Sequence, residues 1–143
     1  MKDFDDFLKL GVIKKQSVDV PRAKDLVSEA NRKFNQIKRI FDKIGLDDEN
    51  ANDIIESSCD VILGLIRAKM FLKGFSASGK GSHEAEVSYL NKLNFKDDEI
   101  EFINKLRYFR NGILYYGKRF NKEYSEKVIN FLNKIVPRLK SLQ

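Results

Sequence analysis

The 143-residue chain has 42% hydrophobic residues and only two prolines, which excludes an intrinsically disordered protein and predicts a single domain spanning residues 1–143. Its one cysteine, Cys59, excludes an intrachain disulfide and a cysteine-based zinc site, and we expect this side chain to be buried. The formal net charge of +6 arises from residues 104–143, where 10 basic side chains accompany 2 acidic ones. This excess indicates either a surface for a polyanion or simply good solubility.

The first ten residues, M-K-D-F-D-D-F-L-K-L, are interrupted by acidic side chains. We therefore expect no signal peptide. The longest apolar stretch, around V-I-L-G-L-I, is much shorter than a membrane span. A cytoplasmic protein without membrane contact is the resulting prediction.

Apolar residues recur with helical spacing along almost the whole chain, and alternating strand patterns are absent. The pattern predicts a short amphipathic helix over residues 3–10 and an extended connector over residues 12–18. Together they form an N-terminal segment, residues 1–19, that precedes a bundle formed by residues 20–140.

Two long helices are expected to open the bundle. The first begins near Pro21, with Asp19 as its N-cap, and ends at Gly45. The second runs from about Asn52 to Lys73 and is apolar around much of its circumference. Such a helix needs packing partners on more than one side.

Three further helices are expected in the second half of the chain. Ser82 caps a short third helix, and a fourth runs from about residue 97 to Gly117. A fifth runs from Asn121 to near the C-terminus, where Pro137 is expected to kink or end its last turn. Short connections between long amphipathic helices predict an all-α fold, an antiparallel bundle of four to five helices.

The stretch G-F-S-A-S-G-K-G-S, residues 74–82, comes close to a phosphate-binding loop but has Gly81 where the motif requires a hydroxyl. A phosphate loop also needs a strand that leads into a helix N-terminus, whereas here the pattern predicts a helix before the loop. We therefore predict a mobile hinge with Lys80 in solvent. No cofactor and no metal site are expected.

Arg110 projects from the middle of an apolar stripe on the predicted fourth helix. A charge in this position costs free energy unless it is paired or partly hydrated. Two interpretations remain open at this point. In one, Arg110 pairs with an acidic residue of a neighbouring helix; in the other, it lies at the base of a cleft that holds an anionic group. Asn111 and Tyr115 share a second face, which is polar and aromatic.

The segment L-R-Y-F-R-N-G-I-L-Y-Y-G, residues 106–117, resembles the motif helix of the HEPN domain family. The family motif is an arginine, a polar residue and a histidine four to six residues after the arginine, and Arg110 and Asn111 match its first two positions. The long helix, the glycine-serine loop and Ser82-His83-Glu84 resemble archaeal members. The similarity covers about residues 20–135. It implies a bundle of four or five helices, commonly a homodimer whose motif helices face each other, and metal-independent RNA cleavage in the active members.

The chain departs from the family at the histidine position, which falls on Tyr115, Tyr116 or Gly117. A tyrosine with an ordinary pKa near 10 is a poor base at neutral pH. Together with the resemblance, this departure implies a module that binds RNA or a nucleotide and has little or no catalytic activity. The residues expected to bind are Arg110, Asn111, Tyr115, Tyr116, Lys118 and Arg119.

Two alternatives stay open. The chain could be a metal-independent ribonuclease toxin of a toxin–antitoxin pair, for which the candidate catalytic residues are Arg110, Asn111, Tyr115, Tyr116 and His83. His83 lies outside the motif and is either a solvent-exposed residue of a first helical turn or reaches the cleft, from the side or across the dimer. The second alternative is a dimeric interaction partner of a small nucleotidyltransferase or of an antitoxin.

Overall fold

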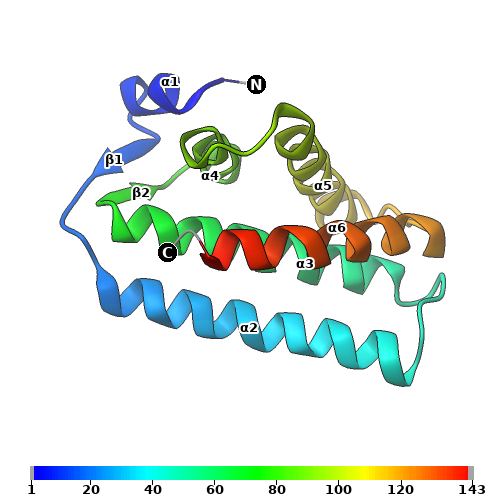
Figure 1. Ribbon diagram of the computed structural model, residues 1–143. Helices are drawn as coiled ribbons and strands as arrows, with labels where there is room; N and C mark the ends of the chain where they lie inside the picture. Colours follow the sequence, from blue (N-terminus) through cyan, green and yellow to red (C-terminus); the bar gives the residue numbers. More distant parts are fainter. Residues whose placement is uncertain (1, 142–143) are drawn as a thin grey trace.

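The computed structural model describes residues 2–141 and is built mainly from helices (Figure 1). The predicted all-α class is confirmed. In chain order the elements are α1 (Phe4–Lys9), β1 (Ile13–Lys15), α2 (Val20–Lys43), α3 (Ala51–Leu72), β2 (Phe75–Ala77), α4 (Ser82–Ser88), the 3-10 helix η1 (Tyr89–Leu93), α5 (Asp97–Tyr116) and α6 (Lys122–Ser141).

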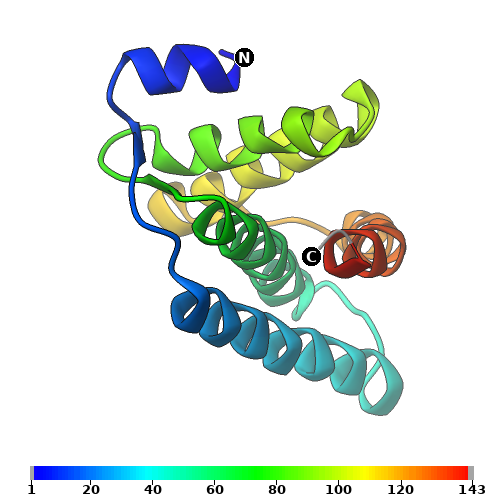
Figure 2. The same ribbon diagram turned by 60° about the vertical axis from the view of Figure 1, so that its left-hand side comes forward.

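Helix α3 lies at the centre of the fold, where α2 packs along one side of it and α5 and α6 pack on others (Figure 2). Fifteen of its 22 residues are buried, among them Ile54, Leu65 and Cys59. Full burial of one such aliphatic side chain contributes about 1.5–3 kcal/mol. The expectation that this helix needs partners on more than one side is confirmed, and burial raises the pKa of the Cys59 thiol to about 12.

The helices do not all run antiparallel to their neighbours. Helices α2 and α3 are antiparallel, but α6 runs in the same direction as α3, and α5 crosses α3 obliquely (Figures 1 and 2). The oblique α5 returns the chain to the end of the molecule where α3 begins. There the backbone N–H of Lys122 donates to the side chain of Asp48, at 2.9 Å, so α6 starts beside the α2–α3 connection.

Two short strands correct the prediction that the chain lacks strands. Strand β1 pairs antiparallel with β2, with Ile13 opposite Ala77. The ladder continues where the Gln16 N–H donates to the Gly74 carbonyl at 2.8 Å. A side chain at Gly74 would lie 2.6 Å from the Gln16 carbonyl oxygen, so only glycine allows this approach. Strands of three residues are too short to show the alternation that identifies strands in a sequence.

The predicted hinge at residues 74–82 is therefore partly regular structure. Helix α3 ends at Leu72, so the expectation that a helix precedes residues 74–82 is confirmed, but strand β2 lies within this segment, before Gly79. The N-cap of α4 is Gly81, and Ser82 is the first helical residue rather than the cap. Because Gly81 has no side chain, no side-chain hydrogen bond caps this helix.

Most other predicted helix ends are confirmed. The Asp19 side chain accepts a hydrogen bond from the Arg22 N–H at 3.1 Å, and α5 is followed by Gly117 in the left-handed conformation. Pro137 does not end the helix, because α6 continues through it to Ser141, the last described residue. Across residues 2–141, none of the helices has both the length and the apolar character needed to cross a membrane.

The core also contains a buried charge. Lys69, on α3, is 3% exposed, and its ammonium group has no hydrogen-bond partner within residues 2–141. Burial lowers the pKa of Lys69 to about 8. Keeping this group protonated at neutral pH therefore reduces the stability of the folded state.

We expect Lys69→Met to raise the free energy of unfolding at pH 7 by on the order of 2 kcal/mol, because methionine fills the same space without a charge. In the wild type, the unfolded chain keeps this proton up to about pH 10.4, whereas the folded chain releases it near pH 8. The destabilisation caused by the buried charge of Lys69 should therefore decrease as pH rises between these two values. Urea unfolding at pH 7 and pH 9.5 measures both effects. The exposed neighbour Lys73→Met is the control, and a Lys69→Met protein less stable than wild type at pH 7 would contradict the account.

Candidate functional site

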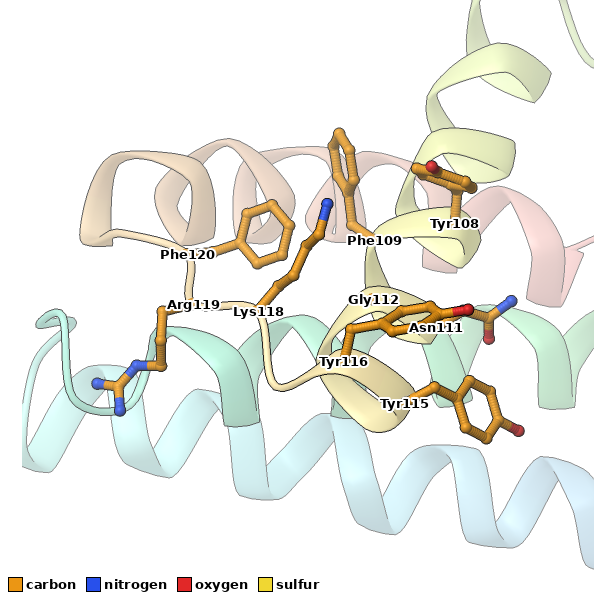
Figure 3. Close-up of a pocket in the computed structure, with 9 residues that line it drawn as sticks. All are labelled: Tyr108, Phe109, Asn111, Gly112, Tyr115, Tyr116, Lys118, Arg119 and Phe120. Atoms are coloured by element: carbon orange, nitrogen blue, oxygen red, sulfur yellow. The ribbon is translucent and has the colours of Figure 1, made fainter.

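The six residues expected to bind RNA or a nucleotide lie on α5 or in the turn that follows it, and they line two separate cavities. Five of them line a cavity of about 520 Å³ at the turn between α5 and α6 (Figure 3). Arg110 instead lines a separate cavity of about 260 Å³ that α2, α3, α4 and α5 enclose. The structure therefore brings Asn111, Tyr115, Tyr116, Lys118 and Arg119 together and places Arg110 apart from them.

We call the larger hollow the tyrosine cavity. It is lined by Tyr108, Phe109, Asn111, Gly112, Tyr115, Tyr116, Lys118, Arg119 and Phe120. Tyr108, Tyr115 and Tyr116 are 63%, 74% and 80% exposed, which is unusual for large aromatic side chains. Exposed aromatic rings grouped around a hollow are typical of a ligand surface.

An aromatic cluster holds two residues that line the tyrosine cavity, Phe109 and Phe120. The Phe109 ring lies 5.0 Å from the Phe120 ring and 5.3 Å from the Tyr124 ring, measured between centroids. These contacts join α5 to the start of α6 and hold Phe109 and Phe120 in place. Burial raises the pKa of Tyr124 to about 12, so this tyrosine is a packing residue and not an acid or base at neutral pH.

The turn between α5 and α6 is held by a side chain from α3. Asn52 donates to the Lys118 carbonyl at 2.8 Å and accepts from the Phe120 N–H at 2.9 Å. The methylene chain of Lys118 packs on Gly112, where an added Cβ would lie 3.3 Å from Lys118 Cδ. Glycine at position 112 thus lets the lysine lie close against α5, and Lys118 lines the cavity together with Phe109 and Phe120 (Figure 3).

Both cations of the tyrosine cavity can interact with a ligand. Lys118 is exposed and forms no ion pair with any residue between 2 and 141. Arg119 lies 3.7 Å from Glu49, but both side chains are largely exposed, and such pairs contribute little. A phosphate group could therefore replace Glu49 as the partner of Arg119.

Arg110 pairs with Asp60 of α3, at 2.9 Å between Nη2 and Oδ1. The second oxygen of Asp60 accepts from Lys33 of α2 at 3.0 Å. Of the two interpretations of Arg110, pairing with a neighbouring acid is thus what the structure shows. The side chain is nevertheless 19% exposed and lines the smaller cavity, and its buried Nε has no acceptor among the described residues.

We call the smaller hollow the polar cavity. It is lined by Leu26, Glu29, Ala30, Lys33, Asp60, Leu63, Gly64, Arg67, His83 and Arg110. His83 therefore shares a cavity with Arg110, although the two residues are far apart in the sequence. Its side chain is 42% exposed, so both expectations for it hold in part: it lies near solvent and it reaches Arg110's cavity.

Glu86 holds two of the residues that line the polar cavity. This carboxylate is 2% exposed, accepts two hydrogen bonds from Arg67, and lies 2.9 Å from His83 Nδ1. Burial opposes ionisation of Glu86, but the hydrogen bonds from His83 and Arg67 outweigh it, and the pKa of Glu86 lies below its usual value. Arg67 is correspondingly held with a raised pKa by its bond to Glu86.

Sequence reasoning missed Lys33, Asp60, Arg67 and Glu86. A usable pattern existed for two of them, because Asp60 and Arg67 are charged residues seven positions apart in a largely apolar helix. That spacing places both on one helix face. Nothing in the sequence identified Lys33 or Glu86 as their partners, since both lie on other helices.

Within residues 2–141, no group of three or more histidine, cysteine, aspartate or glutamate side chains is arranged to hold a metal ion. Comparisons of the chain with family models, curated proteins and solved structures found no match. The two cavities are therefore interpreted from their own chemistry.

We expect Glu86→Gln to lower the free energy of unfolding at pH 7 by about 3 kcal/mol, because Arg67 loses the negative charge that compensates it. In the wild type, the stabilisation that ionised Glu86 provides should be fully present above the pKa of glutamate in the unfolded chain, about 4.3. It should be lost as pH falls through the lower pKa that Glu86 has in the folded chain. Urea unfolding from pH 7 to pH 3 measures this. Glu84→Gln, on the same short helix but only partly buried, is the control. Equal stability of the two variants at pH 7 would refute the role given to Glu86.

Proposed function

We propose that the chain is a HEPN-like module that binds RNA or a nucleotide in the tyrosine cavity, with little or no catalytic activity there. The observation that supports this most strongly is the grouping of three exposed tyrosines and two available cations around one hollow of about 520 Å³. That volume lies within the range of about 300–1,000 Å³ found for small-molecule sites.

The cavity offers the two interactions that single-stranded nucleic acids need. A nucleobase can stack on Tyr108, Tyr115 or Tyr116, and such stacking contributes about 1–3 kcal/mol per base. Lys118 and Arg119 can neutralise the adjoining phosphates, and Asn111 can hydrogen-bond to a base edge. All residues that line the cavity belong to the segment of residues 104–143, which carries the basic excess of the chain.

The chemistry of the lining also agrees with binding rather than catalysis. The residues described as lining the tyrosine cavity include no histidine and no carboxylate, so proton transfer near neutral pH has no suitable group there. The Arg110-Asn111 pair on the late helix α5, within a helical bundle, supports the HEPN assignment.

A short single-stranded RNA should bind with an affinity that falls steeply with salt, because neutralised phosphates release counterions.

Substituting both Tyr115 and Tyr116 by alanine should weaken binding at least tenfold through lost stacking. Lys118→Ala should reduce the slope of log K against log salt by nearly one unit, whereas Lys14→Ala, exposed on β1 outside the tyrosine cavity, should leave it unchanged. Fluorescence anisotropy measures all three, and negligible affinity at low salt, for RNA and mononucleotides alike, would rule the proposal out.

A second candidate, a metal-independent ribonuclease, is favoured by one observation. His83 and Arg110 line the same polar cavity, so an imidazole is available near the motif arginine although the motif position holds tyrosine. Glu86 engages Nδ1 of His83, which leaves Nε2 as the nitrogen able to transfer a proton. A base oriented by a buried acid is a common arrangement in enzymes that activate a hydroxyl.

For this candidate we expect RNA cleavage that persists in EDTA and falls by about 10²- to 10⁴-fold in His83→Ala, the range for loss of a general acid or base. Gel analysis of a labelled RNA, with circular dichroism to check folding, provides the measurement. Wild-type protein that leaves RNA intact at high enzyme concentration excludes the ribonuclease while leaving binding in the tyrosine cavity unaffected.

A further inference from the structure

The polar cavity is chemically unlike the tyrosine cavity, and the two have no lining residue in common. We propose that the polar cavity binds a phosphate group that retains a proton, either inorganic phosphate or a phosphate monoester. This inference does not rest on the function proposed for the tyrosine cavity.

The charge balance of the polar cavity favours an anion. Three permanent cations line it, from Lys33, Arg67 and Arg110. Asp60 is shared by Lys33 and Arg110, so one carboxylate serves two cations. Among the other acids, Glu86 lies between Arg67 and His83, while Glu29 is paired with Arg32 at 2.6 Å. Among the side chains that line the cavity and Glu86, positive charge therefore remains uncompensated even with His83 neutral; Glu56 of α3, outside the lining, is a further acid that interacts with Arg110.

The hydrogen-bonding groups of the cavity also favour an oxyanion. Arg110 has five N–H donors, and its buried Nε–H has no acceptor among residues 2–141. A buried donor without an acceptor destabilises the folded state. Lys33 uses one of its three N–H groups on Asp60. Phosphate oxygens accept several such bonds at once, and arginine suits their geometry.

The size and rigidity of the polar cavity favour a ligand part no larger than a single phosphate group. A volume of about 260 Å³ lies just below the usual range for small-molecule sites, so it suits a phosphate group better than a whole nucleotide. Its walls come from four helices, and buried Glu86 fixes both Arg67 and His83. Donors that are already in place lose little conformational entropy on binding.

Asp60 makes the polar cavity selective for phosphate over sulfate. An ionised carboxylate only accepts hydrogen bonds, and its two oxygens have about four lone-pair positions, of which Arg110 and Lys33 occupy two. A phosphate that retains a proton can donate that proton to a remaining position. Sulfate has no proton near neutral pH and would meet only repulsion there. The cavity should therefore prefer phosphate to sulfate.

Isothermal titration of the full chain with sodium phosphate at pH 6.5 and constant ionic strength tests the proposal. We expect saturable 1:1 binding, at least tenfold tighter than binding of sulfate. Lys33→Met and Arg110→Gln should each weaken phosphate binding tenfold or more. Asp60→Asn should lower the preference for phosphate over sulfate, because the amide no longer repels sulfate.

The controls separate this site from general charge effects and from the tyrosine cavity. Lys24→Met removes an exposed lysine of α2 that does not line the cavity, and it should leave phosphate binding unchanged. Tyr116→Ala should also leave it unchanged, even if it abolishes RNA binding. Lys33→Met keeps the aliphatic stem of a partly exposed side chain, so a folded variant is expected and circular dichroism verifies it.

Adenosine 5′-monophosphate distinguishes the two sources of the phosphate group. Binding as tight as that of inorganic phosphate identifies a terminal phosphate of a nucleotide or RNA, and binding of inorganic phosphate alone identifies the free anion. The proposal is overturned if phosphate gives no saturable heat up to about 10 mM. It is equally overturned if sulfate binds as tightly, or if Lys24→Met weakens binding as much as Lys33→Met.

Discussion

The ion pair between Asp60 and Arg110 determines how the two candidate sites are divided. Asp60 belongs to the central helix α3 and accepts from Arg110 of α5 and Lys33 of α2, so one carboxylate links three helices. Because the guanidinium of Arg110 is held by Asp60, it faces the polar cavity and not the turn between α5 and α6. Asn111, one residue later, lies on the other side of α5 and lines the tyrosine cavity.

Helix α5 consequently presents two chemically different faces. One face contributes exposed tyrosines, supported by the packing of Phe109 on Phe120 and Tyr124, and is suited to planar bases and exposed phosphates. The other contributes a single arginine to a small cavity lined by charged groups that are themselves held by Asp60 and buried Glu86. Stacking requires accessible rings, whereas recognition of a small anion requires donors with fixed positions.

The parts of the fold that depend on local chemistry were predictable from the sequence. Asp19 caps α2, Gly117 ends α5, and the apolar circumference of residues 52–73 indicated a central helix, because capping and burial follow from nearby residues. Strands β1 and β2 were not predictable, since their three-residue pairing joins residues that are 60 to 64 positions apart and depends on Gly74. The parallel course of α3 and α6 likewise results from the oblique path of α5.

The site was predictable to a similar extent. A helical wheel identified Arg110 as a charge in an apolar stripe and Tyr115 as part of a second face, and these are local properties of one helix. It could not identify Lys33 and Asp60 as residues that line a cavity together with Arg110, because they come from two other helices. It also could not show that His83 and Arg110 share a cavity, since no sequence spacing relates them.

The most direct test of the division of α5 into two independent faces is a pair of NMR titrations. The first adds phosphate and the second adds a short single-stranded RNA whose ends carry no phosphate, while the Nε–H signal of Arg110 and the ring signals of Tyr115 and Tyr116 are followed. The account predicts that phosphate shifts the arginine signal and not the tyrosine signals, and that this RNA does the reverse. A common response, in which either ligand shifts both sets together, would contradict it.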